Sequence, residues 1–231
     1  MPAPKVVLLD VGGVLVLPDH ARLLGALSRA GFAPPVELLD RAHYAGAASL
    51  EDPAGTVWPE YWSTYIEAFL TACDIPDDLR EDARDHLASE FAVAATWARV
   101  APGCVDGLHA LRATGVRLGI VSNADGTIEQ MLREKEVAHV GTGPGVEVEV
   151  IVDSTVVGVA KPDARIFEIA LDAMGVAAED SWYVGDMPAF DVGGARNAGL
   201  RPFLMDPDQL HLDADYDRVG SLSELATRVR A

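Results

Sequence analysis

The chain has 231 residues, of which 49% are hydrophobic and 23% are charged, and its formal net charge is −18. This composition is typical of a folded globular protein and argues against a disordered chain. The negative charge argues against nucleic-acid binding, which depends on Lys and Arg side chains that neutralise phosphates. No stretch reaches the length of about 18 apolar residues that a membrane span needs, so we expect no membrane partner.

Cysteine usage and the first residues indicate the compartment. Cys73 and Cys104 are the only cysteines, and nothing in their spacing requires a disulfide. A reducing compartment is therefore the natural interpretation. Residues 1–5 lead directly into a short apolar run without the pattern of a signal peptide. We expect a cytoplasmic protein.

Strand and helix patterns differ between the beginning of the chain and the segment that follows it. Residues 5–9 are short, apolar and partly β-branched, which predicts a buried strand that leads to Asp10. The next segments all have helical patterns separated by turn residues such as Gly31 and Pro76; they are residues 20–30, 36–48, 60–72 and 77–92. We therefore expect a helical insertion at residues 18–95.

Alternation of strands and helices resumes near residue 102. The predicted helices are residues 107–114, 124–136, 164–174 and 190–198, and the predicted strands are residues 117–121, 148–152, 181–184 and 202–204. Such alternation is typical of a parallel sheet with helices on both faces. The expected fold class is α/β, with a core formed by residues 1–17 and 96–231 and a small all-α domain at residues 18–95.

Polar residues follow three of the predicted strands. Asp10 ends the first strand, Ser122 and Asn123 follow the next strand of the core, and Asp186 follows the strand at residues 181–184. Ligands of parallel sheets bind at the carboxyl ends of the strands, so these side chains should converge. Two carboxylates at close range repel unless a cation joins them, and oxygen ligands of this kind suit Mg²⁺.

Each of these groups has a chemical use at such an edge. Asp10 can act as a nucleophile that forms an aspartyl-phosphate. Ser122 and Asn123 offer a hydroxyl and an amide to phosphate oxygens, and Lys161, at a helix start, can neutralise a transferring phosphoryl group. Each residue alone also fits a turn or a helix cap, but the ordered set indicates chemistry on a small phosphorylated substrate.

The motifs together resemble those of the haloacid dehalogenase-like (HAD) superfamily of hydrolases. Asp10-Val11-Gly12-Gly13-Val14-Leu15 resembles the first motif, Val121-Ser122-Asn123 the second and Lys161-Pro162 the third. The fourth motif, the most specific, is matched by Gly185-Asp186 with Asp191 five residues later. The resemblance covers roughly residues 5–205, and the helical insertion is similar to the α-helical cap of the family.

This resemblance implies a Rossmann-like core and a metal site. Mg²⁺ would be held by Asp10, by the backbone carbonyl of Gly12 and by Asp186. Asp10 would be the nucleophile, and Lys161 would hold both Asp10 and the phosphoryl group. Asp191 would bind a metal-bound water or Lys161. The resemblance also implies that the second motif binds phosphate.

Position 12 departs from the pattern of the phosphatases of this family, which usually have a second aspartate there. Gly12 keeps its carbonyl for the metal but supplies no general acid or base, a function worth about 10²–10⁴-fold in rate. Three outcomes stay open. In the first, the substrate is one whose leaving group needs little protonation, such as an acyl phosphate or a sugar 1-phosphate. In the second, Asp19, His20 or Asp125 replaces the missing acid or base. In the third, the protein binds metabolites without hydrolysing them.

The dehalogenase branch of the family also lacks that second aspartate, and it is the alternative enzyme. That branch needs no metal, and its fourth motif typically lacks the aspartate found here as Asp186. An unpaired Asp186 facing Asp10 would be costly without a cation. The sequence therefore favours a Mg²⁺-dependent phosphohydrolase.

Aromatic residues of the insertion bear on the substrate and on assembly. Trp58, Trp62 and Tyr65 share one face of a predicted helix, with Tyr61 beside them. We interpret this cluster as core packing of the insertion, and it also permits a homodimer contact. The sequence does not identify the metabolite.

Overall fold

The first strand lies at the centre of the fold because both of its faces are buried. The computed structural model describes residues 3–50 and 58–231, except for the side chains of residues 58–61. All four residues of β1 (Val6–Leu9) are fully buried. Val6 and Leu8 belong to one hydrophobic cluster, whereas Val7 and Leu9 belong to another. This alternation is the period-two pattern of a strand covered on both sides.

A six-stranded sheet forms around β1 in the order β10-β9-β8-β1-β4-β7, and every pair of neighbours is parallel. The other strands are β4 (Arg117–Ser122), β7 (Val150–Asp153), β8 (Ser181–Gly185), β9 (Arg201–Met205) and β10 (Asp217–Val219). From β1 the chain first adds β4 and β7 on one side and then β8, β9 and β10 on the other side. The order of the strands therefore switches sides at β1. In such sheets this position is the usual ligand site.

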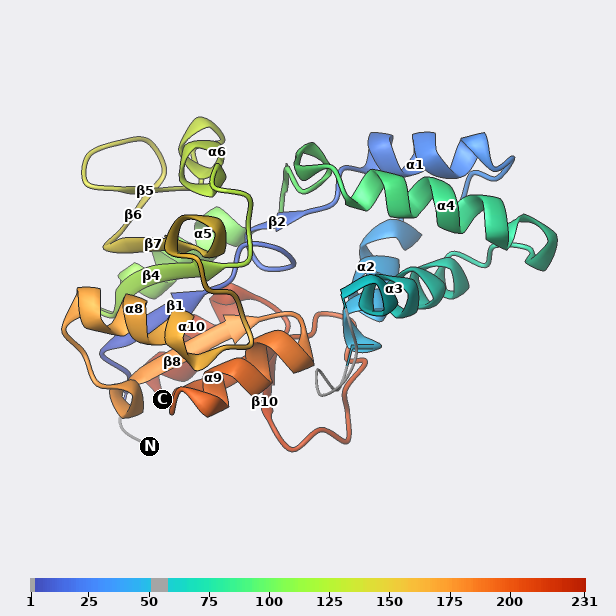
Figure 1. Cartoon of the computed structure of the whole chain (residues 1–231). Coiled ribbons are helices and arrows are strands. Elements are labelled where there is room, and N and C mark those ends of the chain that lie inside the picture. Colours follow the sequence, from blue (N-terminus) through green and yellow to red (C-terminus); the bar gives the residue numbers. More distant parts are fainter. Residues whose placement is uncertain (1–2, 51–57) are drawn as a thin grey trace.

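Helices cover both faces of this sheet (Figure 1). The helices α5 (Cys104–Arg112), α6 (Ile128–Glu134) and α10 (Leu222–Arg230) pack on the face of Val7 and Leu9. The helices α8 (Ala164–Met174) and α9 (Gly193–Asn197) pack on the face of Val6 and Leu8. This arrangement confirms the predicted α/β class.

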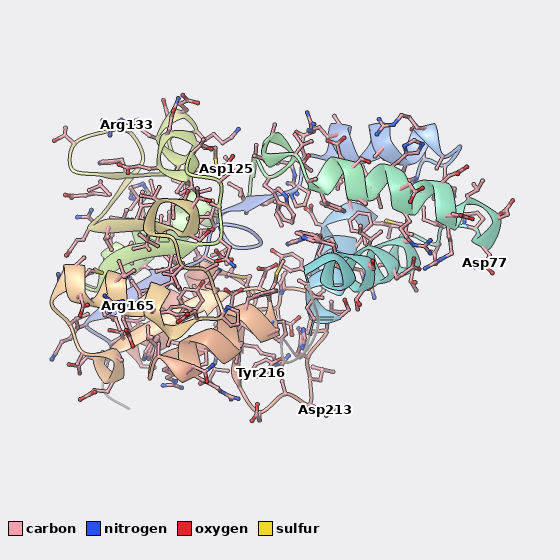
Figure 2. The ribbon with its side chains drawn as sticks, in the orientation of Figure 1. Asp77, Asp125, Arg133, Arg165, Asp213 and Tyr216 are labelled. Carbon is pink, nitrogen blue, oxygen red and sulfur yellow. The ribbon has the colours of Figure 1, made fainter. Side chains whose placement is uncertain are left out.

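A separate group of helices lies beside the sheet (Figure 1). It comprises α1 (His20–Arg29), α2 (Leu38–Ala48), α3 (Trp58–Ala72) and α4 (Arg80–Phe91), which we call the helical insertion. The chain enters and leaves it through the antiparallel pair β2 (Val16–Leu17) and β3 (Arg99–Val100). Leu23, Phe69 and Leu87 belong to its own hydrophobic cluster. Asp77 lies at the end of the insertion farthest from the sheet (Figure 2).

The helical insertion contacts the segment that follows β8. Ala189 N donates a hydrogen bond of 3.1 Å to Leu50 O. Ala189 is also buried in the hydrophobic cluster of the insertion, where Met187 and Phe190 pack against it. The insertion therefore lies directly over the loop that carries the predicted fourth motif.

Short elements complete the described residues. They are the strands β5 (Ala138–Val140) and β6 (Val146–Val148), the helix α7 (Ser154–Val157), the 3₁₀ turns Asp77–Leu79, Ala94–Thr96 and Ala178–Asp180, and a π-helical turn at Pro188–Val192. The predicted strand at residues 148–152 is divided between β6 and β7, which are separated at Glu149. The N–H of Glu149 donates a hydrogen bond of 2.8 Å to Leu118 O.

Two predicted helices begin later than expected because side chains hold the preceding residues in turns. Asp125 Oδ1 accepts from Thr127 N at 3.1 Å, and Asp153 Oδ2 accepts from Gly126 N at 2.9 Å, so α6 begins only at Ile128. Asp191 Oδ2 accepts from Met187 N at 2.9 Å within the π-helical turn, and α9 follows that turn.

The C-terminal elements β10 and α10 were not predicted. The clearest sequence signal for α10 is the Ser-x-x-Glu pattern at its start: Ser221 Oγ accepts from Glu224 N at 3.1 Å, and Glu224 Oε2 accepts from the N–H of Gly220, the residue before the cap, at 2.8 Å. The start of α5 also differs from the prediction: the helix expected at residues 107–114 begins earlier, at Cys104.

Candidate active site

Asp10 and Asp186 leave the sheet at the same edge because their strands are neighbours. Leu9 is paired with Val184, and Asp10 N donates to Val184 O at 2.8 Å. Ser122, the last residue of β4, ends the strand on the other side of β1 and is buried. One carboxylate oxygen from each of Asp10, Asp186 and Asp191 lies within 4.8 Å of the others.

Two glycines make room for these carboxylates. A Cβ at Gly13, where φ is +67°, would stand 2.2 Å from the carboxyl carbon of Asp186. A Cβ at Gly185 would stand 2.2 Å from that of Asp191. Gly12 differs, because a Cβ there would meet nothing closer than the Trp97 ring at 3.9 Å. The backbone therefore requires glycine at position 13 but not at position 12.

Lys161 is buried among acceptors. Its Nζ lies 2.9 Å from Asp10 Oδ1 and 2.7 Å from Asp191 Oδ1, and it donates to Tyr183 Oη at 2.9 Å. The amide of Asn123 holds the backbone of Lys161 from both sides: Lys161 N donates to Asn123 Oδ1 at 2.8 Å, and Asn123 Nδ2 donates to Lys161 O at 3.0 Å. The side chain of Asn123 thus positions Lys161.

The three carboxylates differ in how far their oxygens are paired. Asp191 accepts from Lys161, from Tyr183 Oη at 2.9 Å and from Met187 N at 2.9 Å, so both of its oxygens are used. Asp10 and Asp186 are 7% and 2% exposed. Among the described residues, Asp10 Oδ1 and Asp186 Oδ2 have ion-pair partners, Lys161 Nζ at 2.9 Å and His43 Nε2 at 3.1 Å, but neither they nor Asp186 Oδ1 accept a well-aligned hydrogen bond. Unpaired buried oxygens are costly unless another group binds them.

Burial controls the ionisation of the site. It raises the pKa of Asp10 to about 7, against the attraction of Lys161 and with the repulsion of Asp191 and Asp186. Burial also raises the pKa of Asp186, and His43 opposes this shift. For Lys161, burial disfavours the charged form, but the carboxylates of Asp10 and Asp191 outweigh it, so its pKa is raised.

These observations fit a divalent cation. With all four groups ionised, the carboxylates of Asp10, Asp186 and Asp191 face the single ammonium of Lys161, which leaves two negative charges uncompensated. The carboxylate oxygens of Asp10 and Asp186 are hard ligands of the kind that Mg²⁺ prefers, and none of those without a well-aligned hydrogen bond is exposed. A cation beside Asp10 would also restore its anionic form.

Two residues of α2 that the sequence analysis did not select reach the site. His43 Nε2 lies 3.1 Å from Asp186 Oδ2, and Tyr44 Oη donates to Gly13 O at 2.8 Å. The available signal was a pair of polar rings within an otherwise apolar helix face that includes Leu39. Sequence spacing alone did not connect this face to the strand ends.

The candidates for a replacement acid have local partners. Asp19 Oδ1 accepts from Arg22 N at 3.0 Å and caps α1, and His20 Nε2 lies 2.8 Å from Asp40 Oδ1. Asp125, on the loop before α6 (Figure 2), accepts from the hydroxyl of Thr127 at 2.7 Å. Each of the three side chains therefore has a local structural contact.

The structure describes the side chains of two of the four aromatic residues selected in the insertion, Trp62 and Tyr65. The rings of Trp62 and Tyr65 lie 5.9 and 5.2 Å from that of Phe91, inside the hydrophobic cluster of the insertion. This position agrees with the predicted core packing. The side chains of Trp58 and Tyr61 lie outside the described residues.

Comparison with known families identifies the fold family. The model of the haloacid dehalogenase-like hydrolases matches residues 4–199. The chain belongs to this family. The predicted resemblance is confirmed, and the protein is a HAD-like hydrolase.

Relatives of this HAD-like hydrolase include enzymes named as phosphatases. A phosphoserine phosphatase of Thermus thermophilus is 33% identical over 180 residues, which cover 76% of this chain and 68% of the relative. A phosphoglycolate phosphatase of Rhodospirillum rubrum is 31% identical over 206 residues, which cover 87% of this chain and 79% of the relative. The solved structure of the HAD hydrolase YfnB from Bacillus subtilis, bound to magnesium, has a TM-score of 0.57 at 19% identity, covering 99% of this chain and all of that one.

Gly13→Ala tests the close approach of the first motif to Asp186. The positive φ alone should cost about 1–2 kcal/mol of unfolding free energy, and the clash about 1–3 kcal/mol more. Gly31→Ala is the matched control, because φ there is +84° and no atom lies within 4 Å of the added Cβ. Urea denaturation of the HAD-like hydrolase measures both losses. Equal losses in the two variants would contradict the close approach.

The raised pKa of Asp10 predicts how the stability of the metal-free hydrolase depends on pH. The carboxyl ionises near 3.8 in the unfolded chain but near 7 in the folded chain, so the folded state binds the proton more tightly. The free energy of unfolding should therefore fall as pH rises from about 4 to about 7, by a few kcal/mol. Urea denaturation in chelator should show this fall in the wild type and a shallower one in Asp10→Asn. A wild-type stability that rises over this range would contradict the assignment.

Proposed function

We propose that this hydrolase is a Mg²⁺-dependent phosphohydrolase that acts on a small phosphorylated metabolite through an aspartyl-phosphate on Asp10. One observation carries the proposal: Asp10 and Asp186 bring buried carboxylates together at adjacent strand ends, and the single lysine beside them, with Nζ 2.9 Å from Asp10 Oδ1, does not balance their charge. The phosphoserine and phosphoglycolate phosphatases among its relatives support phosphoryl chemistry.

The metal ligands would be Asp10, the carbonyl of Gly12 and Asp186. A bound Mg²⁺ ion would neutralise phosphoryl oxygens and keep Asp10 ionised. Asp191 is fully paired with Lys161, Tyr183 and Met187, so its contribution is to hold the ammonium of Lys161 in place.

Asp10 would attack phosphorus with a carboxylate oxygen, and the bond to the leaving oxygen would break with its electron pair. Water would then attack the phosphorus of the aspartyl-phosphate, releasing inorganic phosphate and regenerating the carboxylate. Lys161 would pair with phosphoryl oxygens in both steps. Ser122 would donate its hydroxyl to the phosphoryl group, and Asn123 would contribute by fixing Lys161.

Position 12 limits the leaving group. Gly12 cannot donate a proton, and a Cβ there would find Trp97 at an ordinary contact distance of 3.9 Å. The leaving oxygen would therefore depart without help from this position. That constraint favours acyl phosphates and sugar 1-phosphates, whose leaving groups need little protonation.

The helical insertion would act as a cap at residues 18–95 over a core of residues 1–17 and 96–231. Its contacts with Gly13, Asp186 and Ala189 support a role in covering the site and excluding water. No helix in the described ranges 3–50 and 58–231 is long and apolar enough to cross a membrane. Cys73 and Cys104 are buried free thiols, which supports a cytoplasmic location. A homodimer stays a prediction, for which sedimentation is the test.

The dehalogenase alternative rests on Gly12. A dehalogenase needs neither the second aspartate nor a metal, so glycine at position 12 suits it. Asp186 opposes this alternative, because it adds a second buried carboxylate beside Asp10, an arrangement that a metal cation stabilises and that a metal-free dehalogenase does not need.

Phosphate release from a broad panel of phosphorylated metabolites, with Mg²⁺ and with chelator, tests the proposed reaction. Asp10→Asn should lower turnover by about 10⁴-fold or more, because the nucleophile is lost. Asp85→Asn, which removes an exposed carboxylate of α4, is the control and should keep wild-type turnover.

Activity that survives Asp10→Asn or chelation would contradict the proposed mechanism. Chloride release from 2-haloacids in chelator would instead indicate the dehalogenase reaction. Tight metabolite binding without turnover on either panel would indicate a binding protein.

Gly12→Asp tests whether the missing acid limits the range of substrates. If it does, turnover of alkyl phosphates should rise by as much as about 10²–10⁴-fold. Gly12→Asn is the matched control, since its side chain has nearly the same shape but transfers no proton. Steady-state rates on alkyl and acyl phosphates measure the effect. Unchanged rates in a folded, metal-binding Gly12→Asp variant would mean that the missing acid is not limiting.

A further inference from the structure

Tyr183 is a residue of β8 to which the proposed reaction assigns no role. Its side chain is fully buried, and its ring packs edge-on against Phe167 at a centroid distance of 4.9 Å. Its hydroxyl lies 2.9 Å from Lys161 Nζ, 2.9 Å from Asp191 Oδ1 and 3.2 Å from Val121 O. These three residues belong to the third, fourth and second motifs, so a single hydroxyl meets three of the four motifs of the site.

The proton of this hydroxyl determines which contacts are hydrogen bonds. Burial, with the repulsion of Asp10 and Asp191, raises the pKa of Tyr183, so the hydroxyl keeps its one proton. Lys161 donates to the tyrosine oxygen. The hydroxyl in turn donates to the carboxylate of Asp191, which is both closer and charged, in preference to Val121 O. Because Lys161 also donates to Asp191 at 2.7 Å, the three side chains form a triangle of hydrogen bonds.

This triangle leaves one proton of the Lys161 ammonium on the side of Asp10. An ammonium has three protons, and two of them are used in the hydrogen bonds to Tyr183 and Asp191. The contact of Nζ with Asp10 Oδ1, at 2.9 Å, is an ion pair without a well-aligned hydrogen bond. With two protons held, the ammonium cannot rotate about the Cε–Nζ bond, and the third proton stays beside the nucleophile.

We propose that Tyr183 is a positioning residue: together with Asp191, its hydroxyl holds the ammonium of Lys161 so that the third proton meets the phosphoryl oxygens beside Asp10. This inference rests on the phosphohydrolase of the proposed function. Asn123 fixes the backbone of Lys161, and Tyr183 fixes the other end of the same side chain. Electrostatic stabilisation of a transition state depends on donors that are held in place in this way before the substrate arrives.

Tyr183→Phe tests the role of the hydroxyl, because it keeps the ring that packs against Phe167. On the metabolite that the wild type hydrolyses fastest, kcat should fall about 10–100-fold, the factor that corresponds to one hydrogen bond to a charged group. KM should change less than about threefold, since the ammonium itself remains. Tyr216→Phe is the matched control: it removes a hydroxyl that lies 3.0 Å from His211 Nδ1 and should keep wild-type kcat.

NMR of the lysine ammonium groups tests the contact without turnover. The chain has three lysines, of which Lys161 is buried and Lys5 and Lys135 are exposed. With ¹⁵N-labelled lysine at neutral pH, the Nζ protons of Lys161 should exchange with water slowly enough to give a signal, whereas those of Lys5 and Lys135 should not. The signal should shift or broaden beyond detection in Tyr183→Phe and stay unchanged in Tyr216→Phe.

Two results would overturn the inference while leaving the phosphohydrolase intact. One is a wild-type Lys161 ammonium that exchanges as fast as those of Lys5 and Lys135, which decides the matter even if Tyr183→Phe fails to fold. The other is a folded Tyr183→Phe variant that keeps wild-type kcat, or that loses kcat while the ammonium signal is unchanged. Absence of phosphate release by the wild type, with the expected ammonium signal, would instead overturn the proposed function, and with it any part of Tyr183 in the reaction.

Discussion

Three carboxylates buried beside a single lysine impose the constraint on which the site depends. Hydrogen bonds from Lys161, Tyr183 and Met187 stabilise the buried carboxylate of Asp191, whereas Asp10 and Asp186 retain oxygens without an aligned donor. Buried carboxylates of this kind either hold a proton or bind a cation. The raised pKa of Asp10 describes the first state, and the proposed metal site describes the second. Gly13 lets Asp186 stand this close to the first motif.

The helical insertion contributes contacts that the core lacks. It brings His43 to Asp186 and Tyr44 to Gly13, and Trp97, next to its exit strand, faces position 12. The backbone would accept a side chain at Gly12, so space does not exclude a carboxylate there. With the proposed cation and no acid at this position, the site would suit substrates whose leaving group departs unaided.

The parts of the fold that the sequence predicted are those with local causes. The predicted bounds of α8 match the structure because Asp163 caps its first turn and Gly175, with φ of +61°, ends it. Asp10 and Asp186 each followed a short run with the pattern of a buried strand, and both runs are strands, β1 and β8. The late start of α6 has a local cause that the sequence contains, the turn between Asp125 and Thr127, and a second cause that it does not reveal, since Asp153, distant in sequence, holds Gly126. His43 was missed for the same reason, because only tertiary packing brings α2 to the strand ends.

Calorimetric titration of the metal-free wild-type chain with Mg²⁺, in buffers of different ionisation enthalpy, tests the central claim most directly. The account predicts one ion per chain, with proton release at pH 6, where Asp10 still holds its proton, and much less at pH 8. Asp186→Asn should abolish saturable binding. Absence of saturable binding by the wild type, or binding with the same proton release at both pH values, would contradict a cation site built on these buried carboxylates.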